Sequence, residues 1–284
     1  MQQFNQSWAA RRRALLSCTA FAGLVFAGVA GRPGSALAAC TFSDANTFSC
    51  GSTVTGPADV MINATGEATT GTIEAGATIS GLGLAIVADP GGSLNIINNG
   101  AVTGSTGLAL GSVGGNITYS GNGSASGGLA AAGLSIFAVS GTIAVGTADT
   151  PVIPNFSGFA GLATVSSTVT SIFLNGGSLS SLGASGLQMQ GGDVSATLTG
   201  GTTIANAGTA GTGYGIFASS IADPTSIASD ANIGGAGSSF AYGIMSEGDD
   251  SIALSQTGGT IHAATAGLAA ISTGDDAVSV DTAA

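Results

Sequence analysis

The chain has 284 residues, of which 49 are glycine, 44% are hydrophobic and only 7% are charged. This hydrophobic content is too high for a disordered linker. All four basic residues, Arg11, Arg12, Arg13 and Arg32, precede position 33, whereas all 15 acidic residues follow position 43. Because no cationic side chain is present beyond residue 32 to neutralise phosphates, we expect no nucleic-acid partner.

Residues 1–38 are typical of a secretory signal peptide. The three consecutive arginines form a positive n-region, an apolar stretch follows over residues 14–30, and residues 36–38 (Ala-Leu-Ala) fit the small-x-small cleavage pattern. The apolar stretch is short and interrupted by polar residues and glycines, so a membrane anchor is the poorer interpretation. Arg12-Arg13 also resembles a twin-arginine motif, which leaves the Sec and twin-arginine routes of export both open.

Two cysteines, Cys40 and Cys50, follow the predicted signal. In an oxidising compartment a pair with this spacing is typical of a small disulfide loop, worth about 2–3 kcal/mol in the chain-entropy model. Residues 37–40 (Leu-Ala-Ala-Cys) also resemble a lipobox, which would lipidate Cys40, but a polar Gly/Pro segment separates them from the apolar stretch. We predict an N-terminal cap region over residues 39–70 that contains a disulfide.

A repeat runs through the rest of the chain. A Gly followed by Leu or Ile recurs at intervals of 24 to 29 residues. Eight such dipeptides follow this interval, namely Gly83-Leu84, Gly107-Leu108, Gly133-Leu134, Gly161-Leu162, Gly186-Leu187, Gly215-Ile216, Gly243-Ile244 and Gly267-Leu268. Self-similarity at such a period indicates a stacked repeat architecture.

Each repeat also contains two further short apolar segments. One alternates apolar and polar residues, as in Ile172 and Leu174 or Val278 and Val280, and another follows paired glycines, as at Leu179. Period-2 alternation bounded by Gly, Asn and Asp predicts strands and turns. Three strands in each period predict an all-β fold, a right-handed parallel β-helix (β-solenoid) of about nine coils of 24–29 residues over residues 71–284.

Residues 146–158 are the least regular part of this repeat. Pro151 and Pro154 lie close together there, and neither can donate to a strand ladder. We therefore expect a loop inserted between two coils at this position.

A pair of acidic turns offers one candidate cation site. Gly-Asp-Asp occurs at residues 248–250 and again at 274–276, so Asp249, Asp250, Asp275 and Asp276 are expected to stack on one corner of adjacent coils. Stacked carboxylates repel one another, and a hard cation such as Ca²⁺ would relieve that repulsion. The simpler interpretation is a solvated turn in which the Asp side chains accept from nearby amides.

Catalysis finds little support in the sequence. Carboxylate pairs on a β-helix are similar to those of pectin-active hydrolases, which also rely on cationic side chains to bind anionic sugars. The single histidine, His262, is expected to be an outward strand residue, and a Gly-x-Ser-x-Gly elbow is missing. We predict that the chain is not an enzyme, with no catalytic, cofactor-binding or metal-binding residues assigned and no cofactor required.

The export signal, the early cysteine pair and coils such as residues 267–280 (Gly-Leu-Ala-x-x-Ser-x-Gly-Asp-Asp-Ala-Val-x-Val) resemble the passenger domains of autotransporters, the type V secreted proteins of Gram-negative bacteria. The resemblance implies a β-helical passenger displayed at the cell surface or outer membrane, or secreted, and acting in adhesion. It also implies partners on host or neighbouring cells, self-association, and a membrane translocator barrel.

One departure from the family leaves alternatives open. Autotransporters normally end in an aromatic-rich translocator barrel, whereas residues 280–284 stop part-way through a coil. We therefore expect the N-terminal part of a passenger, incomplete at its C-terminal end. The leading hypothesis is a structural stalk or adhesin; the alternatives are a secreted β-helical polysaccharide-active enzyme and a non-functional gene fragment.

Overall fold

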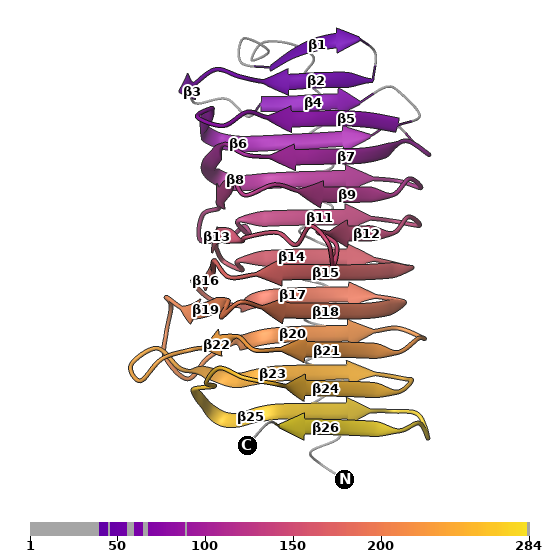
Figure 1. Cartoon of the computed structure of the whole chain (residues 1–284), viewed down its shortest axis with the longest axis vertical. Helices are drawn as coiled ribbons and strands as arrows, with labels where there is room; N and C mark the ends of the chain where they lie inside the picture. The colour runs from indigo at the N-terminus through magenta and orange to yellow at the C-terminus, as the bar shows by residue number, and fades with distance from the viewer. Residues whose placement is uncertain (1–39, 45, 56–59, 65–67, 89, 283–284) are drawn as a thin grey trace. The chain divides into compact units, whose positions relative to one another are not determined.

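The computed structural model describes residues 40–44, 46–55, 60–64, 68–88 and 90–282. The predicted signal peptide over residues 1–38 lies outside this part of the chain. The described residues contain strands and turns but no helix. Successive strands stack in parallel along one axis, and the coils wind with a right hand (Figure 1).

Each coil contributes one strand to each of three parallel ladders, so that the interior is enclosed on three sides. The first ladder, A, is an 11-stranded sheet. Its strands are β1 (Cys40–Asp44), β2 (Thr47–Cys50), β5 (Ala68–Ile73), β7 (Ser93–Asn98), β9 (Ile117–Ser120), β12 (Ile143–Val145), β15 (Val169–Asn175), β18 (Asp193–Thr199), β21 (Thr225–Ser229), β24 (Ile252–Gln256) and β26 (Val278–Thr282).

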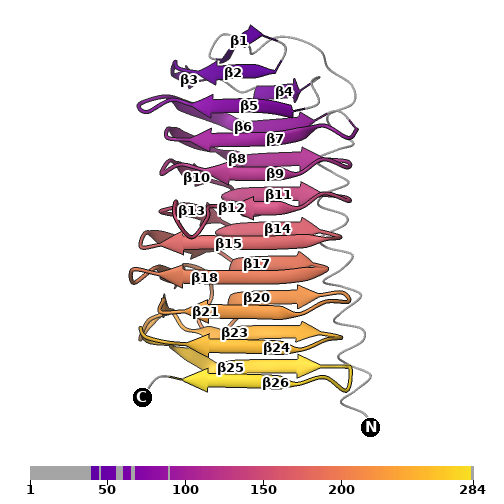
Figure 2. The same cartoon turned by 45° about the vertical axis from the view of Figure 1, so that its right-hand side comes forward.

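The other two ladders, B1 and B2, belong to one 15-stranded sheet, because β6 (Thr78–Ala88) and β8 (Ala101–Ser112) bend and run through both. Ladder B1 also contains β3 (Val54–Thr55), β10 (Ser124–Ser126), β13 (Asn155–Gly158), β16 (Ser178–Ser181), β19 (Thr203–Asn206) and β22 (Asn232–Ile233). Ladder B2 also contains β4 (Val60–Ala64), β11 (Leu134–Ala138), β14 (Leu162–Ser166), β17 (Ser185–Gly191), β20 (Tyr214–Ser220), β23 (Phe240–Gly248) and β25 (Ala263–Ser272). The chain passes from A to B1 to B2 and back to A about nine times (Figure 2).

The Gly-Leu/Ile repeat stacks in a single column on ladder B2. Leu84 pairs with Leu108, Leu108 with Leu134, Leu134 with Leu162, Leu162 with Leu187, Leu187 with Ile216, Ile216 with Ile244 and Ile244 with Leu268. All eight predicted sites therefore lie one above the next. The predicted fold class, an all-β parallel β-helix of about nine coils, is confirmed.

The strands form because their residues alternate between the interior and the surface. In β15 the inward Thr170, Ile172 and Leu174 are buried, while Ser171 and Phe173 between them are partly exposed. This alternation places the aliphatic side chains of every coil in one continuous core. Burial of these side chains, together with the backbone ladders, holds successive coils together.

Glycine permits the corner that leads into ladder B2. Gly107 has a φ of 63°, a conformation that L side chains rarely adopt, and a Cβ atom placed there would lie 2.4 Å from the carbonyl oxygen of Gly133 on the next coil. The close approach of two backbones at this corner therefore requires glycine. The sequence pattern identified Gly107 as part of the repeat, and the stacking of the coils explains why the position requires glycine.

Part of the loop predicted over residues 146–158 is regular structure. Residues 155–158 form β13, which pairs in parallel with β10 and β16. Within the remaining loop Val152 is buried and forms an isolated bridge with Leu174, although prolines lie close on both sides. Pro151 and Pro154 have no N–H group and cannot donate a hydrogen bond. Val152 retains its amide, which donates to the Phe173 carbonyl at 3.0 Å.

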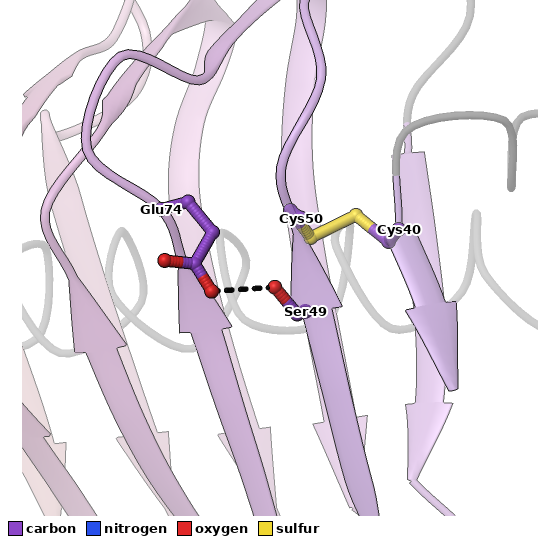
Figure 3. The surroundings of a disulfide bond; sticks show 4 residues. All are labelled: Cys40, Ser49, Cys50 and Glu74. Carbon is purple, nitrogen blue, oxygen red and sulfur yellow. Dashed lines mark hydrogen bonds between the residues drawn. A yellow bond between two sulfur atoms is a disulfide. The ribbon is translucent and has the colours of Figure 1, made fainter. Parts of the chain in front are cut away.

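The N-terminal end of ladder A is covered by a strand of opposite direction. Strand β1 pairs antiparallel with β2, and the disulfide between Cys40 and Cys50 joins two residues that face each other in this pair (Figure 3). The predicted disulfide is thus present. The parallel ladders begin at Thr47, because β2 pairs in parallel with β5, so a first coil lies inside the segment 39–70 that the sequence analysis assigned to the cap region.

At the other end, Val278 and Val280 are in register with Ile252 and Leu254, as their spacing predicts. They are nevertheless 46% and 45% exposed, whereas Ile252 and Leu254 are buried. These two valines continue the inward columns but are left uncovered, because β26 is the last described strand of ladder A.

Candidate functional site

Acidic side chains are distributed unevenly over the three corners of the coil. The corner between B2 and A carries Asp193, Asp223 and the two Asp-Asp turns, and the corner between A and B1 carries Glu74, Asp149 and Asp230. The corner between B1 and B2, in the described coils, carries no acidic residue. Since no basic residue follows position 32, the described residues of this corner contain no Asp, Glu, Lys or Arg side chain. His262, directly before β25, lies at this corner as well.

The two Asp-Asp turns stack, but the described residues do not gather into a metal centre. A Cβ atom on Gly274 would lie 2.1 Å from the Asp249 carbonyl oxygen, which places the two turns in direct backbone contact. The Asp249 carboxylate accepts from the Thr273 hydroxyl, and the Asp250 carboxylate accepts from the Ser251 amide at 2.5 Å. No group of three or more His, Cys, Asp or Glu side chains suited to a metal ion occurs among the described residues.

These contacts favour the turn interpretation over the calcium interpretation. A carboxylate that accepts from a backbone amide of its own turn satisfies that amide and fixes the turn. Asp275 and Asp276, in the turn between β25 and β26, are both exposed. Water therefore hydrates them, which lowers the repulsion that a bound cation would otherwise have to relieve.

His262 is exposed, and the neighbouring coil contacts its backbone. Its amide donates to the Ile233 carbonyl at 2.7 Å, and its carbonyl accepts from the Phe240 amide at 3.3 Å. The residue just before it, Ile261, forms an isolated parallel bridge with Ile233. His262 thus continues the ladder B1 register as a surface residue.

The sequence predicts that five threonines, Thr72, Thr103, Thr118, Thr202 and Thr260, lie on outward strand faces, because threonine has a high strand propensity, and four of them do. Thr103 and Thr260 are exposed and Thr72 and Thr118 are partly exposed, but Thr202 is completely buried. Two consecutive glycines at positive φ, Gly200 and Gly201, turn the chain just before it. The Thr202 hydroxyl then points inward and donates to the Thr199 carbonyl at 3.0 Å, so the assignment of this residue to an outward face is wrong.

Three aromatic rings gather on ladder B2. Tyr214 stacks on Tyr242 with centroids 5.6 Å apart, and its ring centroid lies 5.0 Å from that of Phe217. Burial, the charge of Glu247 and the neighbouring Tyr242 all raise the pKa of Tyr214 above its ordinary value of 10.0. The hydroxyl group therefore stays protonated at neutral pH and offers both a donor and an acceptor at this surface.

An exposed apolar line, which the sequence analysis missed, follows the corner between B1 and B2. Leu82, Leu129, Phe159 and Leu182, here called the apolar ridge, are 40%, 79%, 42% and 37% exposed. Each follows a B1 strand or segment and precedes a B2 strand or segment. Periodicity could not single them out, because they lie outside the alternating segments and their intervals of 47, 30 and 23 residues are irregular.

Hydrogen bonds across the coils keep this corner in register. The Thr106 hydroxyl donates to the Leu82 carbonyl at 2.6 Å, and the Gly128 amide donates to the Ser105 carbonyl at 3.1 Å. On the next coils the Phe159 amide donates to the Gly128 carbonyl at 3.1 Å, and the Ala184 amide donates to the Phe159 carbonyl at 3.0 Å. The ridge therefore stands on five stacked coils.

The remaining predicted features concern the N-terminal side. The thiol of Cys40 is consumed by its bond to Cys50, so it cannot carry a thioether-linked lipid in this structure. Beside the disulfide, the Ser49 hydroxyl donates to the Glu74 carboxylate at 2.7 Å, which joins β2 to the turn after β5 (Figure 3). Among the described residues, no helix is long and apolar enough to span a membrane.

Comparison with known proteins adds no relative to this description. No protein-family model, no curated protein and no solved structure matches the chain.

Proposed function

We propose that this chain is an exported β-helical passenger of autotransporter type that acts at the cell surface as a structural stalk or adhesin. The observation that carries the proposal is the unbroken stack. Each of the eight periodic Gly-Leu/Ile sites is in register with the next from Leu84 to Leu268, and the ladders continue beyond these sites at both ends. Such a stack is stiff along its axis, because bending it would break backbone hydrogen bonds in all three ladders.

The charge distribution and the disulfide support an exported protein. All cationic side chains lie in the first 32 residues, where an export signal requires them, and the remaining chain carries only acidic charge. The Cys40–Cys50 disulfide closes the first strand pair, and such bonds persist in oxidising compartments. The surface of the stack also lacks trypsin cleavage sites, since no Lys or Arg follows Arg32.

The proposal assigns no catalytic step to this chain. The carboxylates of the Asp249 and Asp250 turn accept hydrogen bonds within their own corner, and His262 faces solvent. The described groups therefore do not converge on a point where a substrate would react. An assay of the folded protein on pectin-like and neutral polysaccharides should give no product; release of oligosaccharides would support the enzyme hypothesis instead.

Export and display are tested by fusing the full chain at its C-terminal end to an autotransporter translocator barrel in a Gram-negative host. We expect mass spectrometry to find an N-terminus near residue 39, and externally added proteinase K, unlike trypsin, to digest the displayed chain on intact cells. A matched variant with Arg12→Lys and Arg13→Lys distinguishes the routes, since only twin-arginine export should stop. Accumulation of the uncleaved chain in the cytoplasm would contradict the proposal.

A further inference from the structure

We propose that the aromatic cluster of Tyr214, Phe217 and Tyr242 on ladder B2 is a binding site for a quaternary ammonium group, such as that of choline. The proposal deepens the adhesin function by naming the chemistry of a ligand, and it rests on that function for its role at a cell surface. Its basis is the coincidence of stacked rings, a small residue in register beside them, and acidic charge with no basic side chain.

Two neighbouring coils contribute the three rings of the cluster. Tyr214 and Phe217 lie on β20 and Tyr242 lies on β23, where the register pairs the two tyrosines. All three side chains are partly exposed. The face of an aromatic ring carries partial negative charge, so it attracts a cation that lies within about 6 Å of the ring centroid.

The next coil leaves room beside one face of Tyr242. The residue in register with Tyr242 on β25 is Ala266, and its single methyl group is too small to cover a phenol ring. A β-bulge interrupts the pairing just before Ala266, and Ala264 and Thr265 within this bulge are exposed. Bulges of this kind change the direction of side chains and are frequent beside functional sites.

Asn206 fixes the segments that lead into both tyrosines. Its side-chain amide donates to the Thr209 carbonyl at 3.0 Å, in the loop before Tyr214. The same amide donates to the Ser239 carbonyl at 2.8 Å, in the segment before Tyr242. Because these hydrogen bonds hold the rings in place before a ligand arrives, little conformational entropy is lost on binding.

Electrostatics select a cationic ligand for this cluster. No Lys or Arg follows Arg32, so no basic side chain of the stack competes for the ring faces or repels a cation. The charge of Glu247 contributes to the raised pKa of Tyr214, which means that its field reaches this ring. An anionic ligand would be repelled by the same field. A permanently charged ammonium group with apolar methyl groups suits both the rings and the field.

The test is a titration of the full chain with choline chloride, followed by NMR of ¹³C-labelled tyrosine. The chain has three tyrosines, so the buried Tyr119 serves as an internal reference. We expect the ring signals of Tyr214 and Tyr242 to shift with a millimolar dissociation constant, and those of Tyr119 to stay unchanged. The neutral isostere 3,3-dimethyl-1-butanol should bind about fivefold more weakly or less, because it has the shape of choline without its charge.

Three variants identify the ring face as the contact. Tyr242→Leu should weaken choline binding about three- to fivefold, whereas Tyr242→Phe keeps the ring and should stay within about twofold of the wild type. Ala266→Leu should weaken binding as much as Tyr242→Leu does, because a larger side chain covers the ring face. Phe173→Leu, at a partly exposed position of β15 in ladder A, is the matched control and should have no effect.

Three outcomes would overturn the inference. These are no shift of the Tyr214 and Tyr242 signals at about 100 mM choline, equal affinity for the neutral isostere, or equal weakening by Phe173→Leu and Tyr242→Leu. Far-UV circular dichroism verifies that each variant folds. Every variant should be exported and displayed as the wild type is, so failure of the ligand site and failure of the export and display function are read out separately.

Discussion

The coils around Tyr119 in β9, here called the upper coils, and the coils around Ser246 in β23, here called the lower coils, share one backbone architecture. Their interiors differ. In the upper coils, ladder B2 points pairs of large aliphatic side chains inward, such as Leu134 with Ile136. In the lower coils the residues in register with Leu134 and Ile136 are Ile216 with Ala218, and Ile244 with Ser246, so only the second inward side chain becomes small. Both sets keep the same parallel register with their neighbours.

Polar groups in the two interiors also differ in how they are satisfied. In the upper coils the buried Asn98 amide donates to the Tyr119 hydroxyl at 3.1 Å, and its carbonyl accepts from the Gly100 amide. In the lower coils the hydroxyls of Ser220, Thr225 and Ser246 are buried without a hydrogen-bond partner among the described residues, whereas toward the N-terminal end this holds for one hydroxyl, that of Thr69. Backbone ladders therefore set the fold in both regions, whereas side-chain packing should make the upper coils the more stable.

The largest effect is expected from cavity formation in the upper coils. Leu134→Ala removes a fully buried side chain between Leu108 and Leu162 and should lower the free energy of unfolding by about 3 kcal/mol. Ala218→Gly in the lower coils should cost about 1 kcal/mol. Urea unfolding followed by far-UV circular dichroism measures the free energy of unfolding of both variants. Equal losses in the two variants would contradict a difference in packing between the two interiors.

Removal of the disulfide tests whether the stack depends on its N-terminal end. Replacing Cys40 and Cys50 together by Ser should lower the free energy of unfolding by about 2–3 kcal/mol, because the unfolded chain regains the freedom of the opened loop. Hydrogen exchange should show the loss in β1, β2 and β5 and leave β20 and β23 unchanged. Uniform loss of protection along the chain would mean that the stack unfolds as one cooperative unit.

A smaller effect is expected at the buried Tyr119 hydroxyl. Tyr119→Phe keeps the edge-on contact with Phe156, whose ring centroid is 5.9 Å away, but leaves the Asn98 amide without this acceptor. The Asn98 side chain keeps its bond to the Ser124 carbonyl at 3.4 Å, so one of its two N–H groups is left unsatisfied, at a cost of about 1–2 kcal/mol. A double-mutant cycle with Asn98→Ala isolates the Asn98–Tyr119 hydrogen bond, because loss of the bond between Asn98 and the Gly100 amide cancels in the cycle. A coupling energy near zero would point to packing instead.

The same tyrosine predicts a loss of stability in alkali. Burial raises the pKa of Tyr119 far above its ordinary value of 10.0, although the Asn98 hydrogen bond opposes the shift. Above pH 10 the unfolded chain releases this proton while the folded chain retains it, so stability is constant below that pH and falls as the pH rises further. Tyr119→Phe should reduce the slope, and an identical slope in the two proteins would contradict the assignment.

The smallest expected change has the opposite sign. Ser246→Ala removes a completely buried hydroxyl that has no hydrogen-bond partner among the described residues, and should raise the free energy of unfolding by about 1 kcal/mol or less. Ser195→Ala, on an outward and partly exposed position of β18, is the control and should have no measurable effect. A destabilised Ser246→Ala would mean that this hydroxyl is satisfied in solution.

Sequence periodicity predicted the inward columns because burial repeats with the strand period. Leu84, Leu108 and Leu134 could be aligned from spacing alone, since a residue of the same kind must cover each one on the next coil. Thr202 was misplaced because its orientation follows from a local turn and not from alternation, since consecutive positive-φ glycines turn it inward. The bridge at Val152 lies inside the predicted loop and was not predicted, because prolines close on both sides interrupt the strand pattern.

The sequence by itself determined the repeat length, the three strands of each coil and the pairing of Cys40 with Cys50. These features depend on the alternation of apolar and polar residues, on glycine at the corners and on the short separation of the two cysteines, all of which can be read from the order of the residues. Only the tertiary structure decided which corners carry charge and which carry exposed apolar groups. Leu82, Leu129, Phe159 and Leu182 come together because stacking, and not spacing, brings one corner of five coils into line.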